Sequence, residues 1–390
     1  MKFESLIGIS NQALFVAFIF LLIAIVPVGL SVTSKNVWLQ RLGMCLTYLA
    51  LLLQMTYFVL RWFAIGHAPV SNMYEFMTFF GIMLTASTVL LYQLYKQIVL
   101  VLFSIPISLI VISFGGVFTS DASPLIPALQ SHWLSIHVIT VALSSAILSI
   151  AFTTGVIYLL RVLDVETKTA QTMSLEFVMY CLVLLIGFIM SSFIFSVTLD
   201  ESSIQFENKE GNMEQVIYTM PPLLVNSSAV LADNGKSIGI MEITNFIDAK
   251  KSNTILWAIL IGTFLYLITL MLTRKKIIQL LKPFTMKVNP RIADEMSYRA
   301  IIIGFPLFSL GGLLFAMIWA HLAWGRFWGW DPKEVWALIT WLFYAAFLHL
   351  RTSKGWEGKW TAWMSIAGFG LIVFNQVFVN LVIAGLHSYA

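Results

Sequence analysis

Tryptophan is concentrated in one short segment of the chain, WAHLAWGRFWGWDPKEVW at residues 319–336. The five tryptophans in it are Trp319, Trp324, Trp328, Trp330 and Trp336. Gly325, Gly329 and Pro332 interrupt the segment, which predicts a loop. Such a loop can offer a flat, apolar, π-rich surface to a large planar ligand, and Arg326 and Lys333 could meet carboxylates on that ligand. The alternative is a dense aromatic belt at a membrane surface, although a belt usually supplies about one or two tryptophans per helix end.

Histidines are the residues of this chain that could bind a metal, and there are six of them. The topology given below places five on one side of a membrane: His67, His132, His137, His321 and His387. Neutral imidazole is a common ligand of heme iron, and two histidines from separate helices can hold an iron atom from both faces. A porphyrin also matches the tryptophan segment in shape and charge. Heme is therefore the expected ligand, and a metal site without heme is the alternative.

The histidines differ in how strongly their positions indicate a ligand. His67 and His132 could simply present a polar edge to headgroups and water. His132 and His137 are five residues apart, about 140° around a helix, so they are not expected to bind one metal together. His321 borders the tryptophan segment and is either a ligand or part of its scaffold. His349 lies toward the opposite end of a predicted helix, where an imidazole is costly in lipid, and this favours a functional role.

Acidic residues and cysteines add little chemistry of their own. Asp331 and Glu334 lie beside the basic residues of the loop and are expected to fix its geometry by ion pairs rather than to act as acids or bases. Glu75 starts a predicted helix and is expected to cap it through the helix dipole, with support of the ligand site as the alternative. Cys45 and Cys181 fall in different predicted helices and form no zinc spacing, so they are expected to be packing residues.

The elements that must position these residues are membrane helices. Hydrophobic residues make up 59% of the 390 residues and charged residues 11%, against about 25% charged in soluble domains. Long apolar runs recur, each able to span the hydrocarbon core as a helix. The predicted spans are 11–32, 41–63, 75–95, 97–119, 133–160, 173–198, 253–273, 300–321, 335–351 and 361–385. The expected fold is an all-α polytopic membrane protein, a bundle of about ten transmembrane helices with one outer polar insertion.

Basic residues predict the orientation of the bundle. With the N-terminus outside, fifteen of the 23 Lys and Arg residues fall on the inner side, as the positive-inside rule requires. Both termini and the tryptophan loop are then expected on the extracytoplasmic side of the cell membrane. The first apolar run lacks a basic leader and a cleavage site, so it is expected to be retained. The net charge of +4 reflects this inward bias and gives no argument for nucleic acid.

Two polar stretches divide the chain. The first is an extracytoplasmic insertion at 200–252, in which short alternating runs and turn signals suggest strands. It separates N-terminal membrane helices, 1–199, from C-terminal membrane helices, 253–390, which include the tryptophan loop at 322–336. The second, 274–299, carries seven basic residues among apolar ones and predicts an amphipathic helix at the membrane surface.

Several motifs resemble one family in order and spacing. The segment WGRFWGWDPKE resembles the WWD signature of the heme-handling family that includes ResC and CcsA of cytochrome c biogenesis System II and, more distantly, CcmC and CcmF. The supporting motifs are GHAPVSNMYEFM at 66–77, HWLSIHV at 132–138, FLHLR at 347–351 and GLHSYA at 385–390. The resemblance covers most of the chain from about residue 40 onward, and leaves the first helix and the 200–252 insertion uninformative.

The resemblance implies roles for individual residues. His137 and His387 match the pair of outward histidines that are the axial ligands of heme iron beside the WWD segment. His349 matches the intramembrane histidine of the heme entry path, whose second ligand comes from a ResB/CcsB portion that this chain lacks. A histidine at position 321 departs from the polar amide expected in many relatives, which leaves a supplementary ligand open.

The resemblance also implies a function. The chain is expected to move heme b to the outer face and to present it, held on the WWD loop, for thioether attachment to apocytochrome c as part of a two-subunit cytochrome c synthase. Expected partners are a ResB/CcsB-like protein, an apocytochrome with a CxxCH segment, thiol reductant proteins and membrane lipid. An exporter of heme or another amphipathic solute with no role in attachment is the alternative, and a structural scaffold is a third hypothesis.

Overall fold

The computed structural model describes residues 2–121, 130–198, 202–207, 213–226, 229–231, 241–243 and 249–379. Its helices before the polar insertion are α1 (Lys2–Ser34), α2 (Val37–Ile65), α3 (Met73–Tyr95), α4 (Ile98–Gly115), α5 (His132–Val162) and α6 (Ala170–Thr198). After it come α7 (Ala249–Thr273), α8 (Ile277–Thr285), α9 (Pro290–Phe308), α10 (Ala316–Trp324), α11 (Pro332–Lys354) and α12 (Lys359–Val373). Two π-helical segments, η2 (Ser309–Phe315) and η3 (Phe374–Val379), extend α9 and α12.

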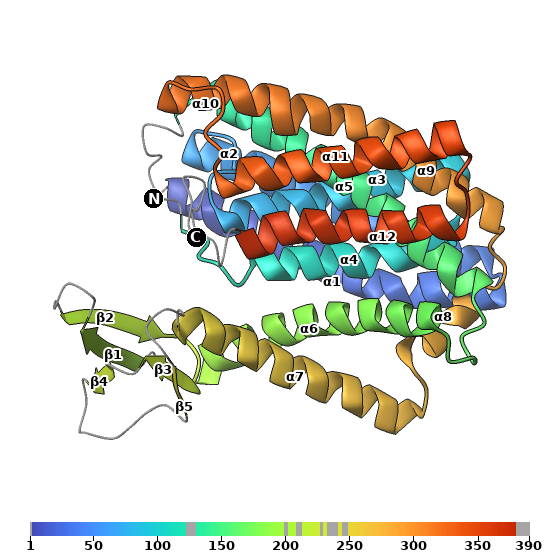
Figure 1. Ribbon diagram of the computed structural model, residues 1–390, viewed down its shortest axis with the longest axis horizontal. Helices are drawn as coiled ribbons and strands as arrows, with labels where there is room; N and C mark the ends of the chain where they lie inside the picture. The colour runs from blue at the N-terminus through green and yellow to red at the C-terminus, as the bar shows by residue number, and fades with distance from the viewer. Residues whose placement is uncertain are drawn as a thin grey trace. The chain divides into compact units, whose positions relative to one another are not determined.

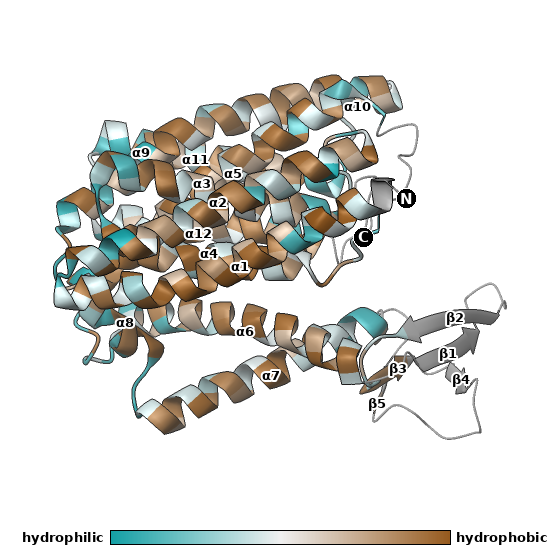
Figure 2. Cartoon of the chain, turned by 180° about the vertical axis from the view of Figure 1, so that it is seen from behind, coloured by the Kyte–Doolittle hydropathy of each residue, from teal (hydrophilic) through white to brown (hydrophobic). Residues whose placement is uncertain are grey.

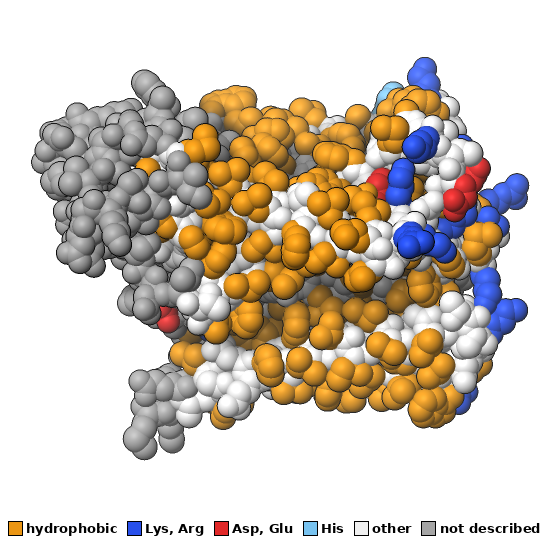
Figure 3. All heavy atoms as spheres, turned by 90° about the horizontal axis from the view of Figure 1, so that it is seen from below, with side chains coloured by type: hydrophobic (Ala, Val, Ile, Leu, Met, Phe, Trp, Pro, Cys, Tyr) orange, Lys and Arg blue, Asp and Glu red, His pale blue; other side chains and the backbone are white. Residues whose placement is uncertain are grey.

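Ten helical spans in the described part of the chain are long and apolar enough to cross a membrane. The expected all-α, multi-pass architecture is therefore confirmed. Apolar residues run along the helices and polar residues gather toward their ends (Figure 2). The space-filling view shows apolar side chains over the flank that faces the reader, with Lys and Arg at one end (Figure 3). The eighth span starts earlier than expected, because α9, η2 and α10 form one continuous stretch, Pro290–Trp324.

The chain forms two compact units, Met1–Thr172 with Ile278–Ala390, and Met173–Ile277. We call them unit 1 and unit 2. In unit 1, α5 runs through the middle and packs against α3, α4, α9 and α12 (Figure 1). Small residues allow this close packing, since a Cβ on Gly155 of α5 would lie 3.0 Å from the Ala362 carbonyl oxygen of α12. The buried Ser149 hydroxyl donates to a carbonyl of its own helix, which satisfies it inside the bundle.

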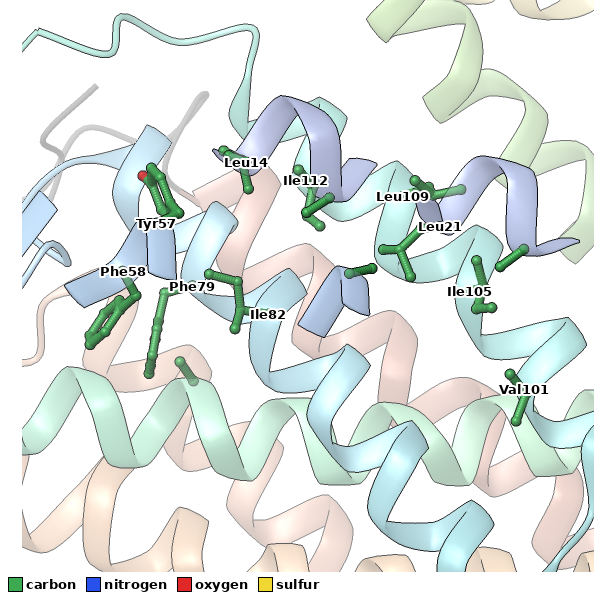
Figure 4. Close-up of a cluster of buried hydrophobic side chains, with 14 of the residues drawn as sticks. Leu14, Leu21, Tyr57, Phe58, Phe79, Ile82, Val101, Ile105, Leu109 and Ile112 are labelled. Carbon is green, nitrogen blue, oxygen red and sulfur yellow. The ribbon is translucent and has the colours of Figure 1, made fainter. Parts of the chain in front are cut away.

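Apolar side chains from α1 to α4 form a buried cluster in the core of unit 1. Figure 4 shows Leu14 and Leu21 of α1 near Ile105 and Ile112 of α4. Phe58 of α2 and Phe79 of α3 stack, with ring centroids 4.7 Å apart. Four further members of this buried cluster are labelled in Figure 4: Tyr57, Ile82, Val101 and Leu109. This packing fixes the ends of α2 and α3, and therefore the loop between them.

Unit 2 consists of most of α6, the polar insertion and α7. Five short strands lie in the insertion: β1 (Ser202–Glu207), β2 (Met213–Tyr218), β3 (Leu224–Asn226), β4 (Ala229–Leu231) and β5 (Met241–Ile243). β1 pairs antiparallel with both β2 and β4, from Ser202↔Tyr218 to Glu207↔Met213 in the first pair, and β3 pairs parallel with β5. The Asn253 side chain of α7 accepts from the Leu223 N–H at 2.7 Å and donates to the Pro221 carbonyl at 3.0 Å, which ties the insertion to α7.

The two long helices of unit 2 cross in close contact. A Cβ on Gly187 of α6 would lie 2.4 Å from the backbone nitrogen of Gly262 in α7, so the crossing requires glycine. Near it, the Tyr266 hydroxyl donates to the Glu176 carboxylate at 2.7 Å. Of the two cysteines, Cys181 is half-buried in α6, whereas Cys45 is exposed on α2 and does not have the packing role expected for it.

The glycine crossing predicts opposite effects for two alanine substitutions. Gly187→Ala should destabilise the protein by about 1–3 kcal/mol, because the added methyl group overlaps the backbone of α7. Gly370→Ala in α12 is the control, since no atom lies within 4 Å of its Cβ position, and it should leave stability unchanged or raise it by up to about 1 kcal/mol. Thermal unfolding in detergent measures both, and equal melting temperatures would contradict the close crossing.

Candidate functional site

A cavity that is open to solvent lies at the end of unit 1 where α10 ends and α5 begins. Five parts of the chain line it: 70–76 at the start of α3, the first turns of α5, the stretch from Phe308 to Ala320, the loop and first turns of α11, and η3. Most of the lining is apolar or aromatic, with a few polar groups among it. This combination is typical of sites for large apolar ligands that carry polar substituents.

His137 lies in the wall of this cavity and is held in one orientation. Its Nδ1 lies 2.8 Å from the carbonyl oxygen of Gly311 in η2, so Nδ1–H donates to that carbonyl. Its ring stacks on Trp319, with planes 10° apart and centroids separated by 5.8 Å. Gly311 is needed for this arrangement, because a Cβ there would lie 2.8 Å from the Val141 backbone nitrogen of α5. Metal-binding histidines are typically oriented by such a bond.

The tryptophan loop connects α10 to α11 and is fixed largely by its own backbone. Gly325 ends α10 with a φ of 69°, and Trp330 adopts a φ of 58°, a conformation that costs energy for a residue with a side chain. Glu334 accepts from the Gly329 and Asp331 N–H groups at 2.7 and 3.2 Å, and the Asp331 carboxylate caps α11 by accepting from the Lys333 N–H. The two carboxylates thus fix the loop through the backbone hydrogen bonds of a capping box, whereas ion pairs were expected from the sequence.

The tryptophans do not all face one surface. Trp319, which is 1% exposed, and Trp328 line the cavity. Trp324 packs edge-on against Trp319, with centroids 4.8 Å apart, whereas Trp330 is 70% exposed and meets Trp328 at 86°. Trp336 packs on Phe374 at the start of η3. The loop therefore contributes a wall and a rim rather than one flat platform.

The remaining predicted residues of this region divide between the cavity and its surroundings. Lys333 lines the cavity. Arg326 is exposed, and its guanidinium lies over Gly329, within 2.8 Å of the position of a Cβ there. His321 is exposed and stacks on Phe327, with centroids 4.2 Å apart, so the structure places it in the scaffold of the loop. His132 is exposed on the first turn of α5.

His349 lies far from the cavity. It is sixteen residues beyond Lys333 in α11, which corresponds to about 24 Å along the helix. The side chain is exposed on the same face of α11 as Ile339 and Leu342. His387 lies outside the described residues. His67 is half-buried in the loop before α3, with its Nδ1 3.0 Å from the Ala68 carbonyl oxygen.

A buried ion pair, which sequence reasoning missed, stands behind one wall of the cavity. Arg61 of α2 donates from Nε to Glu75 of α3 at 2.9 Å, and from Nη2 to the Ser120 carbonyl at 2.8 Å. The two side chains are 0% and 1% exposed. The other Glu75 oxygen accepts from both the N–H and the hydroxyl of Ser71, which lines the cavity. The expectation that Glu75 caps α3 is wrong in detail: Asn72 caps the helix and accepts from the Glu75 N–H.

Two amides were also missed. Asn375 and Gln376 on η3 line the cavity and are 9% and 8% exposed. The Asn375 Oδ1 atom has no hydrogen-bond partner among the residues that the structure describes. The signal that could have found Arg61, Asn375 and Gln376 is that each is a polar residue inside an apolar predicted span.

The fold and the cavity define a class of protein: a polytopic helical membrane protein with a histidine-bearing aromatic cavity at one end of its bundle. A family model described as cytochrome C assembly protein matches residues 70–195 and 255–387. The cytochrome c biogenesis protein CcsA of Prochlorococcus marinus strain MIT 9312 is 30% identical over 393 residues, which cover 99% of this chain and 96% of the relative. The CcsA of strain MIT 9215 is 29% identical over 385 residues, 98% of this chain and 94% of that relative.

The chain belongs to the cytochrome c assembly protein family, in its CcsA/ResC branch. Membership implies an involvement with heme, and the residues of the cavity fit that group. An apolar, aromatic space suits a porphyrin, and an oriented imidazole in its wall suits iron. The family match leaves out residues 196–254, which contain all five strands.

The buried ion pair predicts that one substitution strongly lowers the free energy of unfolding and that a second substitution restores much of it. Arg61→Met should lower the free energy of unfolding by about 3–5 kcal/mol, because it leaves the Glu75 carboxylate buried without its charged partner. Arg61→Met combined with Glu75→Gln should regain much of that loss, since the amide oxygen still accepts from Ser71. Denaturant unfolding in mixed micelles measures the difference.

The exposed pair between Arg299 and Glu295 is the matched control. Arg299→Ala should change stability little, because solvent already screens that pair. If the double variant at 61 and 75 is no more stable than Arg61→Met alone, the unpaired Glu75 carboxylate is not the cause of the lost stability.

Proposed function

We propose that this chain holds heme b in the cavity of unit 1 and presents it to apocytochrome c for covalent attachment. The observation that carries the proposal is His137, whose ring lies in the cavity wall against Trp319 with Nδ1 bonded to the Gly311 carbonyl. The bond directs the Nε2 lone pair for iron and increases its basicity. Family membership supports heme as the ligand rather than another planar molecule.

The second axial ligand in this proposal is His387, which matches the histidine of the GLHSYA motif in the family. Two imidazoles would hold the iron from both faces, with the porphyrin against Trp319 and Trp328 and its propionates near Lys333. When bound, heme supplies the vinyl groups, to which the two thiols of a CxxCH segment add as thioethers. The chain itself positions the ring, excludes water through the aromatic lining and yields one axial position to the CxxCH histidine.

The orientation of the bundle is part of the proposal. The cavity and the tryptophan loop are proposed to lie on the extracytoplasmic side, together with both termini. The inward excess of Lys and Arg supports this orientation, with fifteen of the 23 basic residues on the opposite side. Cytochrome c carrying a CxxCH segment would then meet heme outside the cell membrane.

A partner protein is proposed to cover the exposed face of α11. His349 lies on that face with Ile339 and Leu342, about 18 Å along α11 from Ala337 in the cavity lining, and a bare imidazole facing lipid is costly. We propose that His349 binds heme on its way into the cavity and that a ResB/CcsB-like protein supplies the second ligand. The chain and this partner together would form the cytochrome c synthase, with thiol reductants keeping the CxxCH cysteines reduced.

The first test is a heme spectrum of the purified complex. Wild-type protein should show a reduced spectrum of six-coordinate heme, and His137→Ala should weaken it, with partial recovery on adding imidazole, because the small ligand replaces the lost side chain. His132→Ala, one turn earlier and exposed, is the matched control and should leave the spectrum unchanged. A normal spectrum in His137→Ala would remove His137 from the site.

An attachment assay separates a synthase from an exporter. The complex with its ResB-like partner, given heme and an apocytochrome, should form thioether bonds, detected as heme that stays with the cytochrome after denaturation. Release of heme with no thioether formation would favour an exporter, and a protein without any heme would favour a scaffold.

His349→Ala tests whether His349 binds heme outside the cavity. It should lower the heme content of the complex by about one equivalent and leave the spectral contribution of the cavity unchanged, since His349 and the cavity are separated along α11. Lys354→Ala, exposed at the end of α11, is the control. Heme content that is equal in the two variants would contradict a role for His349.

A further inference from the structure

Three turns at the end of unit 1 where α4 begins carry basic residues and no acidic ones. The four basic residues, which we call the basic patch, are Lys35 between α1 and α2, Lys96 between α3 and α4, Lys287 between α8 and α9, and Arg291 in the first turn of α9. All four side chains are exposed. The sequence has no Asp or Glu in 34–41, 93–98 or 284–293. The patch is therefore positive throughout.

The α8–α9 turn lies against the end of α1. The Lys287 ammonium donates to the Val32 and Thr33 carbonyls at 2.8 and 3.0 Å, just before Lys35 in the chain. Phe284 of α8 packs against the apolar cluster that includes Val32. An ammonium group has three N–H donors, so Lys287 keeps one for a further acceptor. Two cations from distant parts of the sequence are thus held close to each other.

The α3–α4 turn borders the same region. Gln97 of this turn lines a small hollow together with Val288 of the α8–α9 turn and Ile292 of α9. Lys96 precedes Gln97 in the chain, and Arg291 precedes Ile292. The backbone of both cations therefore lies beside this contact, and the fold gathers the four residues of the basic patch around the start of α4.

The acidic residues that follow the patch on α9 are engaged elsewhere. Asp294 accepts from Arg351 at 2.6 Å, and Glu295 pairs with Arg299 at 2.5 Å. Neither carboxylate belongs to the three turns. The cations of the basic patch therefore lie together without a carboxylate among them, and their mutual repulsion favours the binding of an anion.

Other turns at this end of unit 1 mix the two signs of charge. Lys168, after α5, follows Asp164 and Glu166. Lys359, at the start of α12, follows Glu357 by two residues. A general excess of basic residues near a membrane surface does not by itself produce three neighbouring turns without an acidic residue. The basic patch is thus distinct from its surroundings in charge.

Large apolar side chains are exposed beside these cations. Val37 and Trp38, which begin α2, are 57% and 65% exposed, and Met286 in the α8–α9 turn is 49% exposed. A free phosphate ion offers nothing to such side chains. A phospholipid offers a phosphate and, next to it, glycerol and acyl carbons. Tryptophan and basic residues together are typical of the depth where headgroups meet acyl chains.

We propose that the basic patch binds the phosphate of an anionic phospholipid, with Val37, Trp38 and Met286 against the glycerol and the first acyl carbons. Basic pockets between membrane helices are known sites for anionic headgroups. The bound lipid bridges the three turns and relieves the repulsion among their cations. The site is separate from the heme cavity, because Ile157 in the hollow beside the patch is twenty residues beyond His137 on α5, about 30 Å along the helix.

Two double variants test the site. Lys96→Gln with Arg291→Gln removes two cations of the basic patch, and Lys168→Gln with Lys359→Gln removes two exposed cations outside it. The full chain in neutral detergent is titrated with phosphatidylglycerol, and bound lipid is counted by native mass spectrometry. The patch variant should bind about 25-fold more weakly than wild type, since each basic residue near an anionic surface contributes roughly fivefold in affinity. The control variant should bind like wild type.

Two further measurements separate lipid binding from folding. Lys96→Arg with Arg291→Lys keeps both charges and should bind phosphatidylglycerol like wild type. Without phosphatidylglycerol, the Gln variant of the patch should melt at the wild-type temperature or above it, because two like charges are gone. In wild-type protein, phosphatidylglycerol should raise the melting temperature and phosphatidylcholine should not, since a ligand of the folded state stabilises it.

Three results would overturn the proposal. Equal loss of affinity in both Gln variants would show that the lipid responds to the net charge of the chain and not to the basic patch. Equal binding of phosphatidylglycerol and phosphatidylcholine by wild-type protein would show that the lipid charge is not recognised. Displacement of bound phosphatidylglycerol by inorganic phosphate would identify a site for the free ion and would contradict a lipid site. None of these results depends on heme, so the proposed function of the cavity is tested separately.

Discussion

The hydrocarbon core of a membrane offers no hydrogen bonds, and this constraint determines where polar groups can lie in the chain. Hydroxyls inside the helices, such as those of Ser149 and Thr154, donate to carbonyls of their own helix. The charges of Arg61 and Glu75 are paired with each other and are hidden from both lipid and water. Some of the polar side chains near the end of the bundle, among them Ser71, Asn375 and Gln376, line one cavity. A ligand with an apolar body and polar substituents is therefore bound where the bundle itself can tolerate polar groups.

The spans and the site loop could be predicted because they depend on properties that are local in sequence. An apolar run long enough to cross the membrane must be helical, and each predicted span has its helix, although α9 begins ten residues before the expected residue 300. The glycines and Pro332 between two such runs predicted a loop, and the structure has one that holds Trp328 and Trp330. Trp319 and Trp324, which were expected in the same loop, lie in α10, and Trp336 lies in α11. His137 could be selected because the motif that contains it, HWLSIHV, resembles the family's, and the structure puts it in the cavity wall.

The rest of the site depends on contacts between distant segments, which no local pattern records. The Gly311 carbonyl that orients His137 is 174 residues away in sequence. Arg61 was counted with the basic residues outside the membrane, but its pairing with Glu75 makes it an interior group. Side-chain packing also separated the five tryptophans, whose clustering in sequence suggested one flat surface. Trp330 is turned outward by its left-handed backbone, whereas Trp319 is turned inward by η2 and α10.

The π-helical segment η2 adds one residue to the helix that carries it, relative to regular α-helical winding. One extra residue rotates everything that follows by about 100° around the axis. α9 and α10 therefore belong to one membrane span but are set at different rotational registers. The α9 half packs on α5 through Gly304, whose Cβ position lies 2.8 Å from Leu148, and α10 presents Trp319 to His137. The α9 half of the span can thus stay packed on α5 while the orientation of the aromatic residues on α10 is set separately. Substitutions that change the shape of the cavity therefore need not disturb the packing between α9 and α5.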